Sequence, residues 1–293
     1  MPLRYDLHSH STASDGTLAP AELVAHASRQ GVNVLALTDH DTTEGLEEAF
    51  GAASRAGVAL VPGVEISVTW GGGTIHILGL NIDPLHSGLQ QGLAGLRALR
   101  DRRAREIGIR LEKIGVADAY EEARRLAGGG AVGRTHFARV LLERGRADSL
   151  PKVFKSYLVR GKPGYVKEQW ATLEQAVDWI RKAGGQAVIA HLARYRFSAT
   201  RQRQLIGEFK ECGGEGLEVV SGSFTPAECH AMALLAQRFG LGATVGSDYH
   251  GPENTWLELG RTEPLPPGCA PLWKTSGWRL YEGAQGGYPL RLD

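Results

Sequence analysis

Histidines and carboxylates recur in this sequence where short apolar stretches end. His8 and His10 follow the first such stretch, and Asp15 lies in the polar turn after them. Side chains at positions i and i+2 of a strand face the same way, so His8 and His10 can both reach one cation. Asp248 and His250 repeat this spacing near the other end of the chain. Both pairs predict metal ligation.

Four further candidate ligands end or interrupt apolar segments: His40, Glu65, His76 and His191. A lone histidine among isoleucines is more often a core residue than a ligand, so each position alone is weak evidence. The repetition decides, because six of the ten histidines and three carboxylates share this placement. Carboxylates that close raise each other's pKa unless a cation lies among them. Mixed imidazole and carboxylate ligands suit manganese, zinc or iron, and we expect two or three divalent ions, with manganese favoured. Asp39 is expected to form hydrogen bonds at a strand end.

The elements that position these residues alternate between strands and helices. Strands are expected at 3–8, 32–38, 58–62, 65–69, 74–80, 186–190, 216–220 and 242–246. Helices are expected at 20–30, 43–56, 173–183, 200–212 and 226–239. This alternation predicts an α/β fold with mainly parallel strands, and ligands bind such folds at the carboxyl ends of the strands.

Residues 98–168 interrupt the alternation, because they are helical in pattern and contain no convincing strand. We therefore predict a helical insertion, a substrate cap, in a domain formed by residues 1–97 and 169–293. Between Arg97 and Glu168 there are 18 Lys and Arg against 9 Asp and Glu, a balance of +9, which leaves −8 elsewhere. Clustered positive charge attracts anionic ligands, although most of these arginines are expected on solvated helix faces.

Other features exclude several classes of protein. No run of about 18 apolar residues is present, so no membrane span is expected. The N-terminus has no apolar signal-peptide core, which predicts a cytoplasmic location. Three cysteines, Cys212, Cys229 and Cys269, form no CxxC pair, which argues against a disulfide framework or a thiolate zinc site.

Together, the motifs resemble the PHP (polymerase and histidinol phosphatase) family. The matching pieces are His8-Ser9-His10 with Asp15, Thr38-Asp39-His40, Gly63-Val64-Glu65, His76, His191 and Ser247-Asp248-Tyr249-His250. The resemblance runs through the whole chain in order and implies a distorted (β/α)7 barrel that can hold three cations. It implies one ion held by His8, His10, Glu65 and Asp248, a second by Glu65, His76 and His191, and a third by Asp15, His40 and His250.

The segment Gly133–Arg139 is similar to a Gly-Arg-Pro-His-Phe-Ala-Arg signature of one subgroup of this family. That subgroup resembles nucleoside 3′,5′-bisphosphate phosphatases and 5′→3′ exoribonucleases that act on short RNA. Thr135 replaces the usual proline, and Leu192-Ala193 stands where Pro-Gly usually precedes the arginine. Arg134 and Arg194 could then clamp phosphate oxygens, and His136 could bind phosphate or protonate the leaving oxygen.

The favoured function is a phosphoesterase in which a metal-bridged hydroxide attacks phosphorus. Glu65, as bridging ligand, and Arg134 and His136 are the catalytic candidates. A small phosphorylated nucleotide or short oligonucleotide is the expected substrate, since a net charge of +1 disfavours long duplex nucleic acid. Two alternatives stay open: hydrolysis of a carbon ester or amide at a similar metal site, and a non-catalytic metal-bound module.

Overall fold

Seven strands form one nearly closed barrel in the computed structural model, which describes residues 3–167, 169–253, 255–275 and 277–278. The strands follow the chain order: β1 (Tyr5–Asp6), β2 (Val34–Leu37), β3 (Ala59–Trp70), β4 (Gly73–Leu80), β5 (Gln186–Ile189), β6 (Gly216–Ser221) and β7 (Gly242–Gly246). The segment after β1 meets β7, because the Leu7 N–H donates to the Val245 carbonyl at 2.9 Å. The predicted α/β barrel is confirmed.

Most neighbouring strands are parallel, but β4 runs antiparallel to both β3 and β5. The expectation of two strands, at 58–62 and 65–69, was wrong, since β3 continues through Pro62 and Gly63. Its first part pairs with β2, and its second part pairs with β4 from Gly63 to Trp70. The strand is therefore continuous, and what changes near Gly63 is the neighbouring strand with which it pairs.

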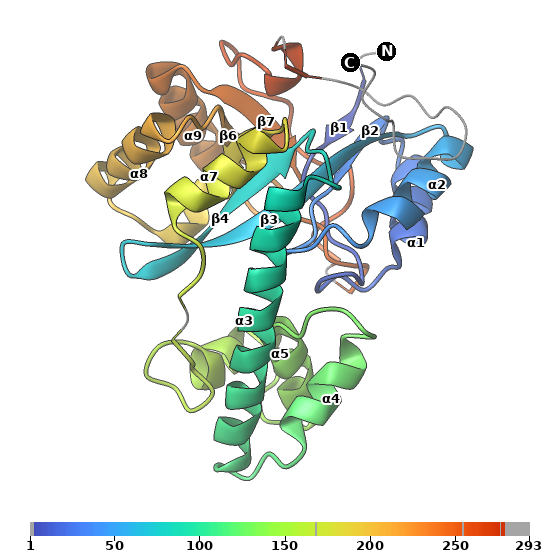
Figure 1. Cartoon of the computed structure of the whole chain (residues 1–293), viewed down its shortest axis with the longest axis vertical. Helices are drawn as coiled ribbons and strands as arrows, with labels where there is room; N and C mark the ends of the chain where they lie inside the picture. The colour runs from blue at the N-terminus through green and yellow to red at the C-terminus, as the bar shows by residue number, and fades with distance from the viewer. Residues whose placement is uncertain (1–2, 168, 254, 276, 279–293) are drawn as a thin grey trace.

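Helices cover the outside of the barrel in two groups (Figure 1). The first group is α1 (Pro20–Arg29) and α2 (Leu46–Ala56), and the second is α7 (Leu173–Lys182), α8 (Ala199–Glu211) and α9 (Pro226–Phe239). Local sequence fixes several ends: Thr172 and Thr225 form capping boxes at the starts of α7 and α9. Gly57 and Gly240 end α2 and α9 in the left-handed conformation that glycine adopts readily. Among the described residues, no helix combines the length and apolar character needed to cross a membrane.

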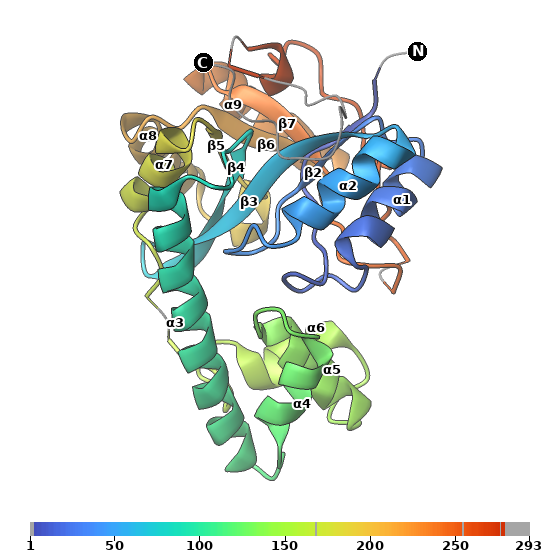
Figure 2. The ribbon, with the colours of Figure 1, turned by 45° about the vertical axis from the view of Figure 1, so that its right-hand side comes forward.

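A long helix, α3 (Ser87–Glu112), leads away from the barrel and carries a smaller helical group at its far end (Figures 1 and 2). That group consists of α4 (Ala119–Leu126), α5 (Arg134–Glu143), α6 (Leu150–Val153) and the π-helical turn η1 (Phe154–Leu158). It has its own apolar cluster around Phe137 and Leu141, into which Leu111 of α3 packs. The division into residues 1–97 with 169–293 and residues 98–168 remains a proposal, and parts of it (1–2, 168, 254, 276 and 279–293) lie outside the described residues.

Candidate metal centre

All nine predicted ligands converge at one end of the barrel. His8 and His10 follow β1, His40 follows β2, and His191 follows β5, while Asp248 and His250 follow β7. Glu65 and His76 lie within β3 and β4, and Asp15 belongs to the turn after His10.

The Glu65 carboxylate is buried at the centre of this group. Its Oε1 lies 2.9 Å from His76 Nδ1 and 3.0 Å from His191 Nε2. Its Oε2 lies 3.0 Å from His40 Nδ1, and the Nε2 atoms of His8 and His10 are 3.4 Å and 3.3 Å away. One carboxylate thus faces five imidazoles, as a ligand shared between ions would.

The possible ligand atoms form four overlapping groups whose members lie within 4.8 Å of one another. The groups are His8, His10 and Asp248; His8, Glu65 and His191; His40, Glu65 and His76; and His10, Asp15, His40 and His250. Of the three predicted sets, that of Asp15, His40 and His250 falls within one group. His76 and His191 fall in different groups, and Glu65 is not grouped with His8, His10 and Asp248. Which residue holds which ion therefore stays a prediction.

Several atoms in this cluster are buried and have no hydrogen-bond partner among the described residues: His8 Nε2, both ring nitrogens of His10, Asp15 Oδ1, His40 Nδ1, Glu65 Oε2 and His191 Nδ1. A buried polar atom without a partner costs about 1–3 kcal/mol. Divalent cations would coordinate several of these atoms at once, and imidazole with carboxylate is a suitable donor set. The residues present therefore fit a cluster of divalent ions.

The pKa values of the buried carboxylates and imidazoles also fit a cluster of divalent ions. Burial alone would raise the pKa of Glu65, but the imidazoles of His40, His76 and His8 hold it well below its ordinary value. The pKa of Asp248 is likewise well below its usual range, because His8 and His10 outweigh the effect of burial. Burial would lower the pKa of His10, but the carboxylates of Asp248 and Glu65, each with an oxygen 3.3 Å from Nε2, raise it to about 10. A cation at His10 would take the place of that proton.

Glu218 of β6 is a site residue that the sequence analysis missed. Its Oε1 lies 3.0 Å from His8 Nδ1, and its Oε2 accepts the His191 backbone N–H at 2.6 Å. A histidine that donates from Nδ1 to a carboxylate presents Nε2 as the ligand atom, and His8 Nε2 faces Glu65 and Asp248. A detectable signal existed, since Glu218 interrupts an apolar strand as Glu65 does.

Asp39 makes the strand-end hydrogen bonds that were predicted for it. Its carboxylate accepts the Ser11 N–H at 2.8 Å, the Ser11 hydroxyl at 2.7 Å and the Ser14 hydroxyl at 2.6 Å. These bonds fix the turn that carries Asp15. Two other candidate ligands, His191 (φ 31°) and Asp248 (φ 57°), have left-handed backbone conformations two positions after the last residue of their strands. Aspartate and histidine tolerate this region better than most residues.

A cavity of about 400 Å³ opens beside the cluster. Besides candidate ligands, its lining includes Arg100, Arg103, Arg134, Arg194, Thr135, Phe154, Trp170 and Tyr195. Arg194 Nη1 donates to Asp248 Oδ2, and the Arg134 guanidinium lies 6.0 Å from the centre of the Phe154 ring. The cavity therefore joins the candidate metal ligands to a wall of arginines and aromatic rings.

His136 does not line this cavity. It is buried at the start of α5, where its Nδ1 accepts the Gly133 N–H at 3.0 Å. Burial lowers the pKa of His136 to about 4. Near neutral pH the imidazole is therefore uncharged, and its proton is on Nε2.

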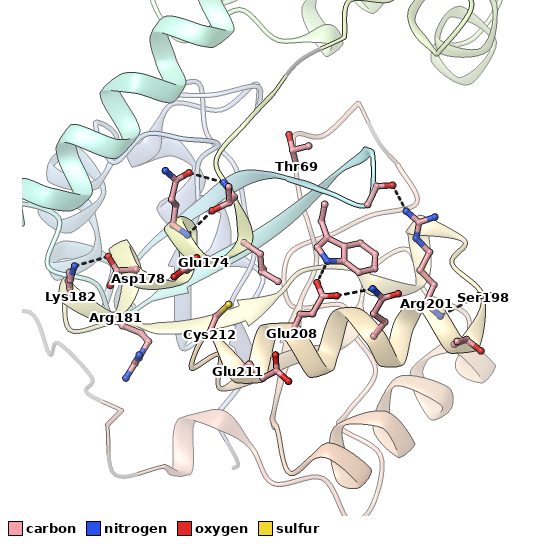
Figure 3. Close-up of a pocket in the computed structure, with 17 residues that line it drawn as sticks. Thr69, Glu174, Asp178, Arg181, Lys182, Ser198, Arg201, Glu208, Glu211 and Cys212 are labelled. Atoms are coloured by element: carbon pink, nitrogen blue, oxygen red, sulfur yellow. Dashed lines mark hydrogen bonds and ion pairs between the residues drawn. The ribbon is translucent and has the colours of Figure 1, made fainter.

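A larger hollow of about 1460 Å³ lies elsewhere, between α7, α8 and the tip of the β3–β4 hairpin (Figure 3). None of the nine candidate ligands lines it. Several of its polar groups bind one another: Trp70 Nε1 donates to Glu208 at 2.5 Å, and Lys182 pairs with Asp178 at 2.8 Å. Size alone therefore does not identify the site.

Comparison with known proteins agrees with the geometry. The PHP domain family matches residues 6–211. The chain is 48% identical over 280 residues to a 3′,5′-nucleoside bisphosphate phosphatase of Chromobacterium violaceum, covering 95% of this chain and 98% of that protein. It is 49% identical over 272 residues to the 5′-3′ exoribonuclease Rnm of Escherichia coli, covering 92% of each. A solved structure of an amidohydrolase from Chromobacterium violaceum, with bound sulfate and no metal, superposes with a TM-score of 0.89 at 48% identity, covering 92% of this chain and 94% of that one.

Proposed function

This chain belongs to the PHP domain family, and we infer that it is a metal-dependent phosphoesterase that hydrolyses phosphate esters of nucleotides. The observation that carries this inference is the buried Glu65 carboxylate, which faces five imidazoles beside a cavity lined by arginines. The nucleotide phosphatase and exoribonuclease names of the relatives support the substrate class. The sulfate bound by the similar structure is a tetrahedral anion, as a phosphate group is.

We propose that the nine ligands hold two or three divalent ions, with manganese favoured over zinc or iron. Such ions, when bound, would polarise a phosphoryl oxygen and lower the pKa of water from about 15.7 to near 7. Within the chain, Glu65 would be shared between neighbouring ions, and Glu218 would orient His8 from behind.

Arg134 and Arg194 are proposed to bind the phosphate oxygens of the substrate. Both line the cavity, and guanidinium groups match the planar geometry of phosphate and carboxylate oxygens. Arg194 already donates to Asp248 through Nη1. A guanidinium has five N–H donors, so the same side chain can link a metal ligand to the substrate.

For His136 we propose a role other than proton transfer. An imidazole with a pKa of about 4 is a poor proton donor near neutral pH, because almost none of it is charged. Its Nδ1 is occupied by the Gly133 N–H. We propose that His136 shapes the start of α5 and offers Nε2–H as a hydrogen-bond donor behind Arg134 and Thr135.

We propose that the helical segment 98–168 closes over a small substrate. It carries Arg100, Arg103 and Arg134 to the cavity, together with the Phe154 ring. A cavity of about 400 Å³ falls within the usual size of small-molecule sites. A mononucleotide or the end of a short oligonucleotide fits this volume better than long duplex nucleic acid.

The test is a comparison of turnover on adenosine 3′,5′-bisphosphate, AMP and short 5′-phosphorylated RNAs, with protein of measured metal content. Phosphate release from the bisphosphate would identify a phosphatase, and mononucleotide release from RNA an exonuclease. A parallel series of carboxylic esters and amides tests the rival chemistry that the amidohydrolase name suggests. Turnover of those compounds alone, or of no compound by metal-loaded protein, would overturn the proposal.

A further inference from the structure

Thr135 links the helical segment to the candidate metal ligands. It is the second residue of α5, and its hydroxyl Oγ1 donates a 2.9 Å hydrogen bond to Asp15 Oδ2. The other oxygen, Asp15 Oδ1, is buried without a hydrogen-bond partner among the residues described. It lies 3.4 Å from His250 Nε2 and 3.9 Å from His40 Nε2. One carboxylate oxygen of Asp15 therefore contacts α5, and the other faces the candidate metal ligands His250 and His40.

The backbone around this contact is also tied together. Arg139, one turn along α5, donates to the Asp15 carbonyl at 3.3 Å and pairs with Glu253 at 2.9 Å. Gly130, just before α5, approaches so closely that a side chain there would come within 2.7 Å of the Thr12 carbonyl. These contacts hold the start of α5 against the turn that carries Asp15, so the Thr135 hydroxyl reaches a carboxylate whose main chain is already fixed.

The other two carboxylates of the cluster contact residues of the barrel domain. Glu65 is surrounded by imidazoles, and Asp248 accepts a hydrogen bond from Arg194. The Asp15 side chain, by contrast, is held by Thr135 of the helical segment. A change at Thr135 should therefore affect one cation and spare the others.

We propose that Thr135 is a positioning residue that sets the affinity of the cation bound by Asp15, His40 and His250. This inference rests on the metal cluster of the proposed function. By holding Oδ2, the hydroxyl fixes the side-chain rotamer that directs Oδ1 toward His250 and His40. Hydrogen-bond partners of ligating carboxylates typically change metal affinity by about 10–100-fold when removed. Proline, which the resembled signature has at this position, carries no hydroxyl and cannot make this bond.

The experiment is a calorimetric titration of Mn²⁺ into metal-free protein, with bound metal counted after gel filtration. Thr135→Val keeps the shape and removes the hydroxyl, whereas Thr135→Ser keeps the hydroxyl. We expect one ion to bind about 10–100-fold more weakly in Thr135→Val and the others to bind as in wild type. Thr135→Ser should titrate like wild type. Ser149→Ala, which removes a hydroxyl bonded only to its neighbour Asp148 in the described structure, controls for a polar deletion in the same segment.

His250→Ala identifies the ion concerned. It should remove the same ion that Thr135→Val weakens, and adding Thr135→Val to it should cause no further loss. Equal titrations of Thr135→Val and wild type would overturn the inference, as would uniform weakening of every ion or a defect in Thr135→Ser equal to that in Thr135→Val. No nucleotide is present in these titrations. Their failure would leave the phosphoesterase assignment intact, and wild-type protein inactive on nucleotides would overturn that assignment without altering the ion count.

Discussion

The buried His136 allows a quantitative test of how the start of α5 is built. Its side chain is 1% exposed, and burial lowers its pKa from 6.5 to about 4. The folded protein therefore binds the His136 proton more weakly than the unfolded chain does. Stability from the neutral imidazole is fully present above pH 6.5 and is lost as the pH falls toward 4.

The size of the effect follows from the two pKa values. Linkage between an unfolded pKa of 6.5 and a folded pKa of about 4 predicts a loss of about 2.5 kcal/mol between roughly pH 7.5 and pH 4.5. His136→Asn removes this titration and keeps an acceptor near the position of Nδ1 for the Gly133 N–H. The difference in unfolding free energy between wild type and variant should therefore shrink by about 2.5 kcal/mol over that interval.

Urea unfolding of the metal-free proteins at several pH values measures this difference. Both proteins carry the same candidate metal ligands, so the titration of those ligands largely cancels. His230→Asn, at an exposed position of α9, supplies the baseline for the substitution itself. A difference that stays constant within about 0.5 kcal/mol, the usual scatter of a surface substitution, would refute the neutral buried imidazole. It would also return His136 to consideration as a general acid.

Three further substitutions test the site. Glu65→Ala should abolish hydrolysis and lower the metal content measured by mass spectrometry; near-normal turnover would contradict its shared position. Arg134→Ala should retain full metal content and raise KM by about 10–150-fold, from the loss of roughly 1.5–3 kcal/mol in hydrogen bonds to a charged group; metal loss equal to that of Glu65→Ala would make it structural. Glu218→Gln should weaken metal binding by about 10–100-fold through His8, and an unchanged Mn²⁺ titration would exclude this orienting role.

The convergence of the nine candidate ligands could be predicted because each one stands at a recognisable position in the strand pattern. His40 and His191 end apolar runs, and Glu65 and His76 interrupt them, so the strand pattern itself shows where they lie. Because parallel strands bring their carboxyl ends to one edge of the sheet, residues at these positions were expected to lie close together. The continuous β3 was not visible in this way, because Pro62 and Gly63 look like a break while the partner strands decide the pairing.

Contacts between distant segments could not be read from the sequence. The pairing of Glu218 with His8 spans 210 positions, and that of Thr135 with Asp15 spans 120. The burial of His136 could not be read from the sequence either. Its neighbour Phe137 belongs to the apolar cluster of the helical segment. No local pattern shows which face of a short helix meets another part of the chain.

The barrel and the helical segment contribute different kinds of residue to the site. The barrel supplies most of the candidate metal ligands from strand ends whose backbone is fixed by the sheet, and Glu218 contacts His8 from within the same barrel. The helical segment supplies Arg100, Arg103 and Arg134 from outside. The segment can therefore change its substrate contacts with little effect on the metal ligands, except where the Thr135 hydroxyl reaches Asp15. There, a residue of the helical segment that lines the cavity also holds a candidate metal ligand, so substrate specificity and ion affinity would have to change together.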